Sequence, residues 1–125
     1  MRLALSLSLA SLLLAVPVHA QELELEYATG TVCDTQKEME RYVAVFDGDA
    51  AAAIATVNAE EHDPSACALA TVTYLRGPEL GTARNKNSAF QIVRILVVGV
   101  ATAQGIQVVK PAALFTIFGI REYAV

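Results

Sequence analysis

Few side chains in this sequence of 125 residues could carry nucleophilic catalysis. Beyond residue 20, Ser65 and Ser88 are the only serines and His62 is the only histidine. His62 lies three residues before Ser65, whereas a Ser-His-Asp triad needs a histidine that faces the nucleophile and a third group that orients it. We therefore expect no catalytic residues and no enzyme activity.

The one cluster with metal-ligand chemistry is Glu60-Glu61-His62-Asp63, whose carboxylates and imidazole are common ligands of divalent cations. Four consecutive residues rarely point at one ion, and Pro64 follows them directly. We expect a solvated loop at the end of a helix and no metal. The sequence also has no glycine-rich phosphate motif, so no nucleotide or other cofactor is expected.

Basic side chains gather locally at Arg76, Arg84 and Lys86, in a chain whose formal net charge is −4. They bracket a segment with glycine and asparagine, and such a segment could receive an anion through charge and backbone N–H groups. The anion could be a phosphate or a carboxylate of a cell-wall peptide. The alternative is that these side chains only keep a hairpin loop soluble.

The two cysteines, Cys33 and Cys67, have neither a CxxC spacing nor a base beside them in the sequence. In an exported domain with two cysteines, the two most often pair. We expect a structural disulfide that closes a loop of about 34 residues, which the chain-entropy estimate values at about 4 kcal/mol.

An uninterrupted apolar run, Leu3 to Val16, follows Arg2 and is too short to cross a bilayer. Pro17 ends it, and Val18-His19-Ala20 provides the small residues that a signal peptidase reads. We expect residues 1–20 to be a signal peptide and residues 21–125 to be a single domain in the periplasm or outside the cell. Because Arg2 leaves with the leader, the net charge of that domain is −5.

Two helices are expected next to each other. Thr35 and Glu38 have the spacing of a capping box, and an apolar face with helical periodicity follows them. Asp47-Gly48 ends this helix, and Asp49 can cap a second, alanine-rich helix that extends through Asn58 or Glu60. The apolar face of the first helix comprises Met39, Tyr42, Val43 and Phe46.

The strands are expected around these helices. A first strand covers Tyr27 to Cys33, although Gln21 to Glu26 reads as a frayed terminus. A second strand, Ala68 to Tyr74, is closed by Gly77-Pro78, and a loop from Leu80 to Ser88 follows it. The later strands are expected at Phe90 to Val100, Ile106 to Val109 and Leu114 to Arg121, with a break or bulge at Pro111.

This order of elements predicts an α+β fold with a small antiparallel meander and a two-helix insertion after the first strand. The strands could curl into a partly open barrel that resembles an SH3-like fold. The alternative is a plain two-layer sandwich of helices on a sheet.

Three segments resemble small exported proteins of unassigned function from rhizobia-like alphaproteobacteria. They are Gly30 to Thr35, Val57 to Glu60 before Cys67, and Phe90 to Gly99. The resemblance implies a signal peptide and a cysteine pair, and it brings no activity or catalytic residue with it.

With 13 acidic and 9 basic side chains, the chain is not expected to bind nucleic acid. The absence of catalytic groups favours a non-catalytic binding or interaction module, whose partner is a protein, a peptide or a cell-wall fragment. The alternative is a structural or assembly subunit, a homo-oligomer that self-associates through the apolar strand Phe90 to Val100. No membrane anchor is expected after cleavage of the leader.

Overall fold

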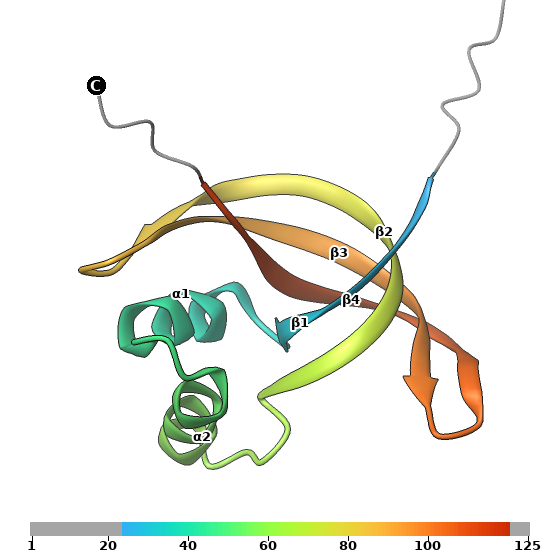
Figure 1. Cartoon of the computed structure of the whole chain (residues 1–125), viewed down its shortest axis with the longest axis horizontal. Helices are drawn as coiled ribbons and strands as arrows, with labels where there is room; N and C mark the ends of the chain where they lie inside the picture. The colour runs from blue at the N-terminus through green and yellow to red at the C-terminus, as the bar shows by residue number, and fades with distance from the viewer. Residues whose placement is uncertain (1–23, 121–125) are drawn as a thin grey trace, which may run out of the picture.

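A computed structural model describes residues 24–120, so the expected signal peptide lies outside the described residues. These described residues form four strands and two helices, arranged as in Figure 1. In chain order they are β1 (Leu25–Cys33), α1 (Gln36–Val45), α2 (Ala50–Glu61), β2 (Cys67–Arg84), β3 (Ala89–Thr102) and β4 (Gly105–Gly119). The expectation of a small α+β protein with an antiparallel meander is confirmed.

The helices begin where the sequence predicts. The Thr35 side chain accepts a hydrogen bond from the Glu38 N–H at 3.1 Å, and the Asp49 side chain accepts one from the Ala52 N–H at 3.1 Å. Both bonds satisfy an N–H group that the first turn of a helix leaves without a backbone partner. Glu38 is buried, and its Oε1 atom has no hydrogen-bond partner, so the return bond of a capping box is not made by that atom.

Strand β2 is longer than expected, and the prediction that Gly77-Pro78 closes it is wrong. The pairing with β3 shifts register between Arg76 and Glu79, so Pro78 lies in a bulge, where its missing N–H removes no regular ladder bond. A Cβ atom on Gly77 would collide with the carbonyl oxygen of Arg94, so glycine is required for this close approach.

The expected loop from Leu80 to Ser88 is therefore also wrong, because β2 continues to Arg84 and only residues 85–88 form the turn.

A similar bulge accommodates Pro111. Strand β4 runs continuously past it, and the pairing with β3 shifts register between Val97 and Gly99. Proline thus marks bulges in this sheet and ends neither strand.

Two buried clusters lie on opposite faces of the strands. One fills the interior of the curved sheet and is built from Val32, Val72, Tyr74, Val93, Ile95 and Val97. The other lies where the helices cover the outer face and includes Cys33, Met39, Tyr42, Val43, Val57 and Ile92. The helices cover only one end of the strands, and the β3–β4 hairpin projects at the other end (Figure 1).

The disulfide between Cys33 and Cys67 is formed, with an S–S distance of 2.02 Å. It joins the end of β1 to the start of β2, where the two cysteines are direct cross-strand partners. The strand order closes on itself because β1 also pairs with β4, at Cys33 and Phe115. Within residues 24–120 no helix is long and apolar enough to span a membrane.

Candidate functional site

Strand β1 has one edge on β2 and another that faces β4. Asp34 N–H donates to the Ala66 carbonyl oxygen at 2.9 Å, which marks these residues as a hydrogen-bonded pair one step past Cys33. In an antiparallel ladder such pairs alternate along the strand. The backbone groups of Tyr27, Thr29 and Thr31 therefore point away from β2, towards β4.

Strand β4 meets this edge only briefly. In the part of the chain that the structure describes, the two strands pair at Cys33 and Phe115 alone, and the Thr116 hydroxyl donates to the Thr31 carbonyl oxygen at 2.8 Å. Further along, the Ile120 N–H donates to the Ala89 carbonyl oxygen, which holds the end of β4 to β3. The edge at Tyr27 and Thr29 is thus left without a β4 partner among residues 24–120.

A hollow of about 260 Å³ opens at this seam between β1 and β4. Its lining is mainly apolar and belongs to the interior of the curved sheet. The lining includes Ala28, Gly30, Val32, Val72, Ile95 and Phe118. Nothing lies within 4 Å of the position that a Cβ atom on Gly30 would occupy, so the glycine leaves this space open.

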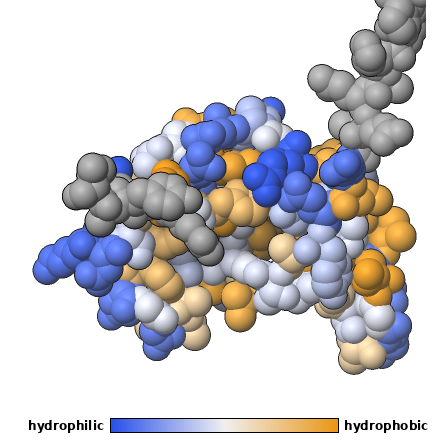
Figure 2. All heavy atoms as spheres, turned by 45° about the horizontal axis from the view of Figure 1, so that its top comes forward, coloured by the Kyte–Doolittle hydropathy of each residue, from blue (hydrophilic) through white to orange (hydrophobic). Residues whose placement is uncertain are grey.

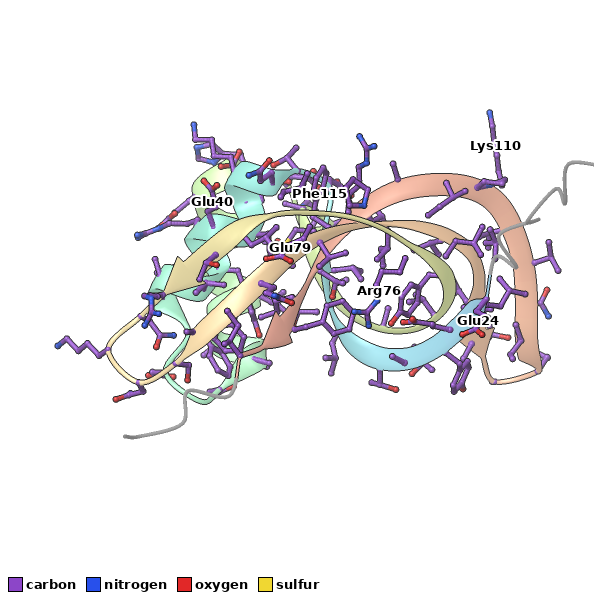
Figure 3. The ribbon with its side chains drawn as sticks, turned by 90° about the horizontal axis from the view of Figure 1, so that it is seen from above. Glu24, Glu40, Arg76, Glu79, Lys110 and Phe115 are labelled. Carbon is purple, nitrogen blue, oxygen red and sulfur yellow. A yellow bond between two sulfur atoms is a disulfide. The ribbon has the colours of Figure 1, made fainter. Side chains whose placement is uncertain are left out.

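Charged side chains lie beside the hollow and neutralise one another. Arg76 Nη2 contacts Glu26 Oε2 at 3.2 Å, and the Arg76 guanidinium lies 3.9 Å from the centre of the Phe118 ring. Arg76 points into the ring of strands (Figure 3). The hydrogen bond from Tyr74 and the contact with Arg76 lower the pKa of Glu26, while burial and the bond to Glu26 raise the pKa of Tyr74. This group links β1, β2 and β4.

The three basic residues singled out from the sequence do not form one site. Arg84 and Lys86 line a separate hollow of about 420 Å³ at the β2–β3 turn, together with Phe90 and the end of β4. The β3 partners of Arg76 and Arg84, Ile95 and Ala89, are six positions apart, which separates the two arginines by about 20 Å at the usual rise per residue. The structure therefore places Arg84 and Lys86 together and Arg76 elsewhere, in contact with Glu26.

The cluster from Glu60 to Asp63 lies at the end of α2, but Glu60 and Glu61 are the last residues of the helix, and only His62 and Asp63 follow it. Glu60 forms an ion pair with Arg41 at 2.9 Å, His62 caps the helix with a left-handed backbone (φ 53°), and Asp63 accepts hydrogen bonds from Ser65. Among residues 24–120 no group of three or more His, Cys, Asp or Glu side chains is arranged to hold a metal ion.

Two asparagines that the sequence analysis did not single out hold the elements around these sites. Asn58 on α2 accepts a hydrogen bond from the Cys67 N–H at 2.8 Å and donates to the Cys67 carbonyl oxygen at 3.0 Å. Asn85 in the β2–β3 turn donates to the carbonyl oxygens of Val43 and Phe46 at the end of α1. The sequence signal for Asn85 was its position in a polar turn, and Asn58 had no comparable local signal.

A second feature is an exposed apolar surface at the end of the strands that the helices leave uncovered. We define this outer apolar face by its large exposed side chains, which are Leu25, Tyr27, Leu96, Ile106 and Val108. Val108 is 90% exposed and Leu25 is 62% exposed. Apolar side chains gather between the start of β1 and the β3–β4 hairpin in Figure 2.

No described protein family, curated protein or solved structure matches this chain.

Proposed function

We propose that this protein is an exported, non-catalytic binding module that takes up an extended, apolar polypeptide segment by strand addition at β1. The proposal rests on two features that occur together. One edge of β1 faces an open seam, and an apolar hollow lies behind that edge. Strand addition uses both features, because main-chain hydrogen bonds supply affinity and pockets for alternate side chains supply specificity.

The geometry suits a segment that lies along Tyr27 and Thr29. The backbone groups of these residues point towards the seam, and a bound strand would pair with them. Successive side chains of a strand point to opposite faces, so alternate side chains of the segment would face the hollow. A cavity of about 150 Å³ accommodates a benzene ring, so a hollow of about 260 Å³ has room for one large apolar side chain.

The compartment and the architecture are part of the same proposal. The disulfide agrees with an oxidising environment, which supports export to the periplasm or beyond. The small curved meander, in which β1 and β4 pair at Cys33 and Phe115 alone within residues 24–120, supports the SH3-like assignment and the insertion of the helix pair after the first strand.

Two other hypotheses from the sequence have less support. Self-association through Phe90 to Val100 could use the edge or the apolar face of this strand, and the edge is not free, because β3 pairs with β2 and with β4 along this stretch. An anion site that combines Arg76, Arg84 and Lys86 would need these side chains to converge, and Arg76 is held by Glu26 instead. Both observations favour the seam of β1 as the binding site.

The test is selection of peptides that alternate apolar and polar residues from a phage-displayed library, followed by calorimetry on synthetic copies. Gly30→Leu fills the hollow and should weaken binding about tenfold or more, equivalent to about 1.4 kcal/mol. Gly30→Ala adds one methyl group in open space and should leave the affinity close to that of the wild type.

Thr29→Pro provides an independent variant, since it removes an N–H group that points to the seam and leaves the β1–β2 ladder bonds in place. It should abolish or strongly weaken binding. In the wild type, a bound peptide should slow amide hydrogen exchange at Tyr27 and Thr29. Peptides that bind both variants as tightly as the wild type, or a library that yields no binder, would show the proposal to be wrong.

A further inference from the structure

We infer that the outer apolar face binds a second copy of this chain, so that the protein forms a two-fold symmetric dimer. The groups that this inference uses differ from those of the proposed peptide site, because it rests on side chains that point away from the interior and not on the backbone at the seam or its hollow. Tyr27 borders both surfaces.

The outer apolar face is continuous across all four strands. Tyr27, Thr73, Gly99 and Val108 follow one another as direct cross-strand partners, and Leu25, Leu75 and Leu96 form a second row in the same way. Both rows point outwards, because the residues on either side of them, such as Val72 and Val97, fill the interior. Cross-strand neighbours on one face lie about 5 Å apart, so the rows form one surface.

No position in these two rows carries a charge. Exposed large apolar side chains that are grouped in this way are typical of interaction sites, whereas isolated ones are common on any surface. The helices cannot cover this surface, since they pack on the other end of the strands, against Cys33, Cys67 and Ile92 (Figure 1).

Charges of opposite sign at its border, Glu24 and Lys110, can pair in a symmetric arrangement, and Arg94 on β3, two residues before Leu96, is a further exposed cation there. Glu24 precedes β1 on one side, and Lys110 lies on β4 on the other side, both exposed and at the end of the molecule away from the helices (Figure 3). A two-fold axis that lies in the plane of the face and runs parallel to the strands brings the β1 side of one copy onto the β4 side of the other. Each Glu24 would then face Lys110 of the second copy, while the uncharged rows meet in the centre.

The experiment is sedimentation equilibrium of the protein recovered from an exporting bacterial host, from micromolar to millimolar concentration. The wild type should show a reversible monomer–dimer equilibrium. Val108→Glu buries an unpaired charge in the interface and should weaken dimerisation at least tenfold. Leu80→Glu is the matched control, because Leu80 is an exposed leucine outside this face, and it should dimerise like the wild type.

The border charges give a second, less disruptive test. Glu24→Lys or Lys110→Glu alone should weaken the dimer about two- to fivefold, and the double exchange should restore it, as expected for an exposed ion pair. Circular dichroism confirms that each variant is folded. A wild-type protein that stays monomeric at millimolar concentration, or a dimer that tolerates Val108→Glu, would overturn the inference. Loss of peptide binding by Gly30→Leu without any change in dimerisation would leave both proposals standing.

Discussion

Glu26 shows how a single side chain couples the proposed site to stability. It accepts a hydrogen bond from Tyr74 and pairs with Arg76, and both contacts favour its charged form. Its pKa is therefore lower in the folded chain than in the unfolded chain. A group of this kind stabilises the fold at pH values above its unfolded pKa, and that contribution is lost as the pH falls through the folded pKa.

We predict that Glu26→Gln lowers the free energy of unfolding at neutral pH by a small amount, because the ion pair is partly exposed to water. The difference from the wild type should shrink steadily below the ordinary glutamate pKa and vanish in strong acid. Urea denaturation over a pH series measures it. Glu61→Gln is the control, since within residues 24–120 the exposed Glu61 side chain has no hydrogen bond or ion pair. A gap between wild type and Glu26→Gln that widens on acidification would contradict the assignment.

Individual side chains also show which contacts can be predicted from the sequence and which cannot. Thr35 and Asp49 cap their helices through bonds to residues three positions away, so their roles are visible in the local sequence. Asn58 bonds to both backbone groups of Cys67, and this contact exists only after α2 and β2 pack together. Arg76 and Glu26 meet across neighbouring strands, 50 positions apart, so their pairing required the register of the sheet.

At the scale of elements, the helices were predictable and the strand ends were not. Helical periodicity and caps are local, whereas Gly77-Pro78 and Pro111 signal a turn and a bulge equally well when the partner strand is unknown. The shift of register opposite β3 decides in favour of bulges at both places. The free edge of β1 could not be predicted either, because it exists only where β4 does not pair with β1. No sequence pattern in either strand shows how far that pairing extends.

The disulfide is the element-scale feature with the largest expected effect on stability. It closes a loop of 34 residues that contains both helices, and Asn58 ties the second helix to Cys67 directly. We predict that replacing both cysteines by alanine lowers the free energy of unfolding by about 4 kcal/mol, chiefly by enlarging the unfolded ensemble.

Urea denaturation of the double variant against the oxidised wild type measures this loss. Reduction of the wild type is the control, because it opens the same loop without changing the sequence. A loss well below 2 kcal/mol in both cases would mean that the packing of the helices on β1, β2 and β4 restrains the chain almost as well as the covalent bond.

For the whole molecule, the sequence predicted an α+β meander with two helices and a cysteine pair, and each of these is observed. The two faces of the sheet were harder to foresee. Alternation along each strand indicates which residues share a face, but it does not show that helices cover only one end of the outer face. Both proposed surfaces lie beyond that cover, at the seam and on the outer apolar face.

These surfaces would act outside the cytoplasm only if the leader is removed. The run from Leu3 to Val16 and the small residues before Gln21 predict cleavage after Ala20. We expect the exported protein to begin at Gln21 and to carry no free thiol, as intact-mass measurement before and after alkylation would show. Ala20→Phe should block cleavage, because the peptidase requires a small residue there, and its product should keep the leader. Recovery of the wild type from the cytoplasm with residues 1–20 intact and both thiols free would contradict export, and it would remove the compartment in which the proposed partner is expected.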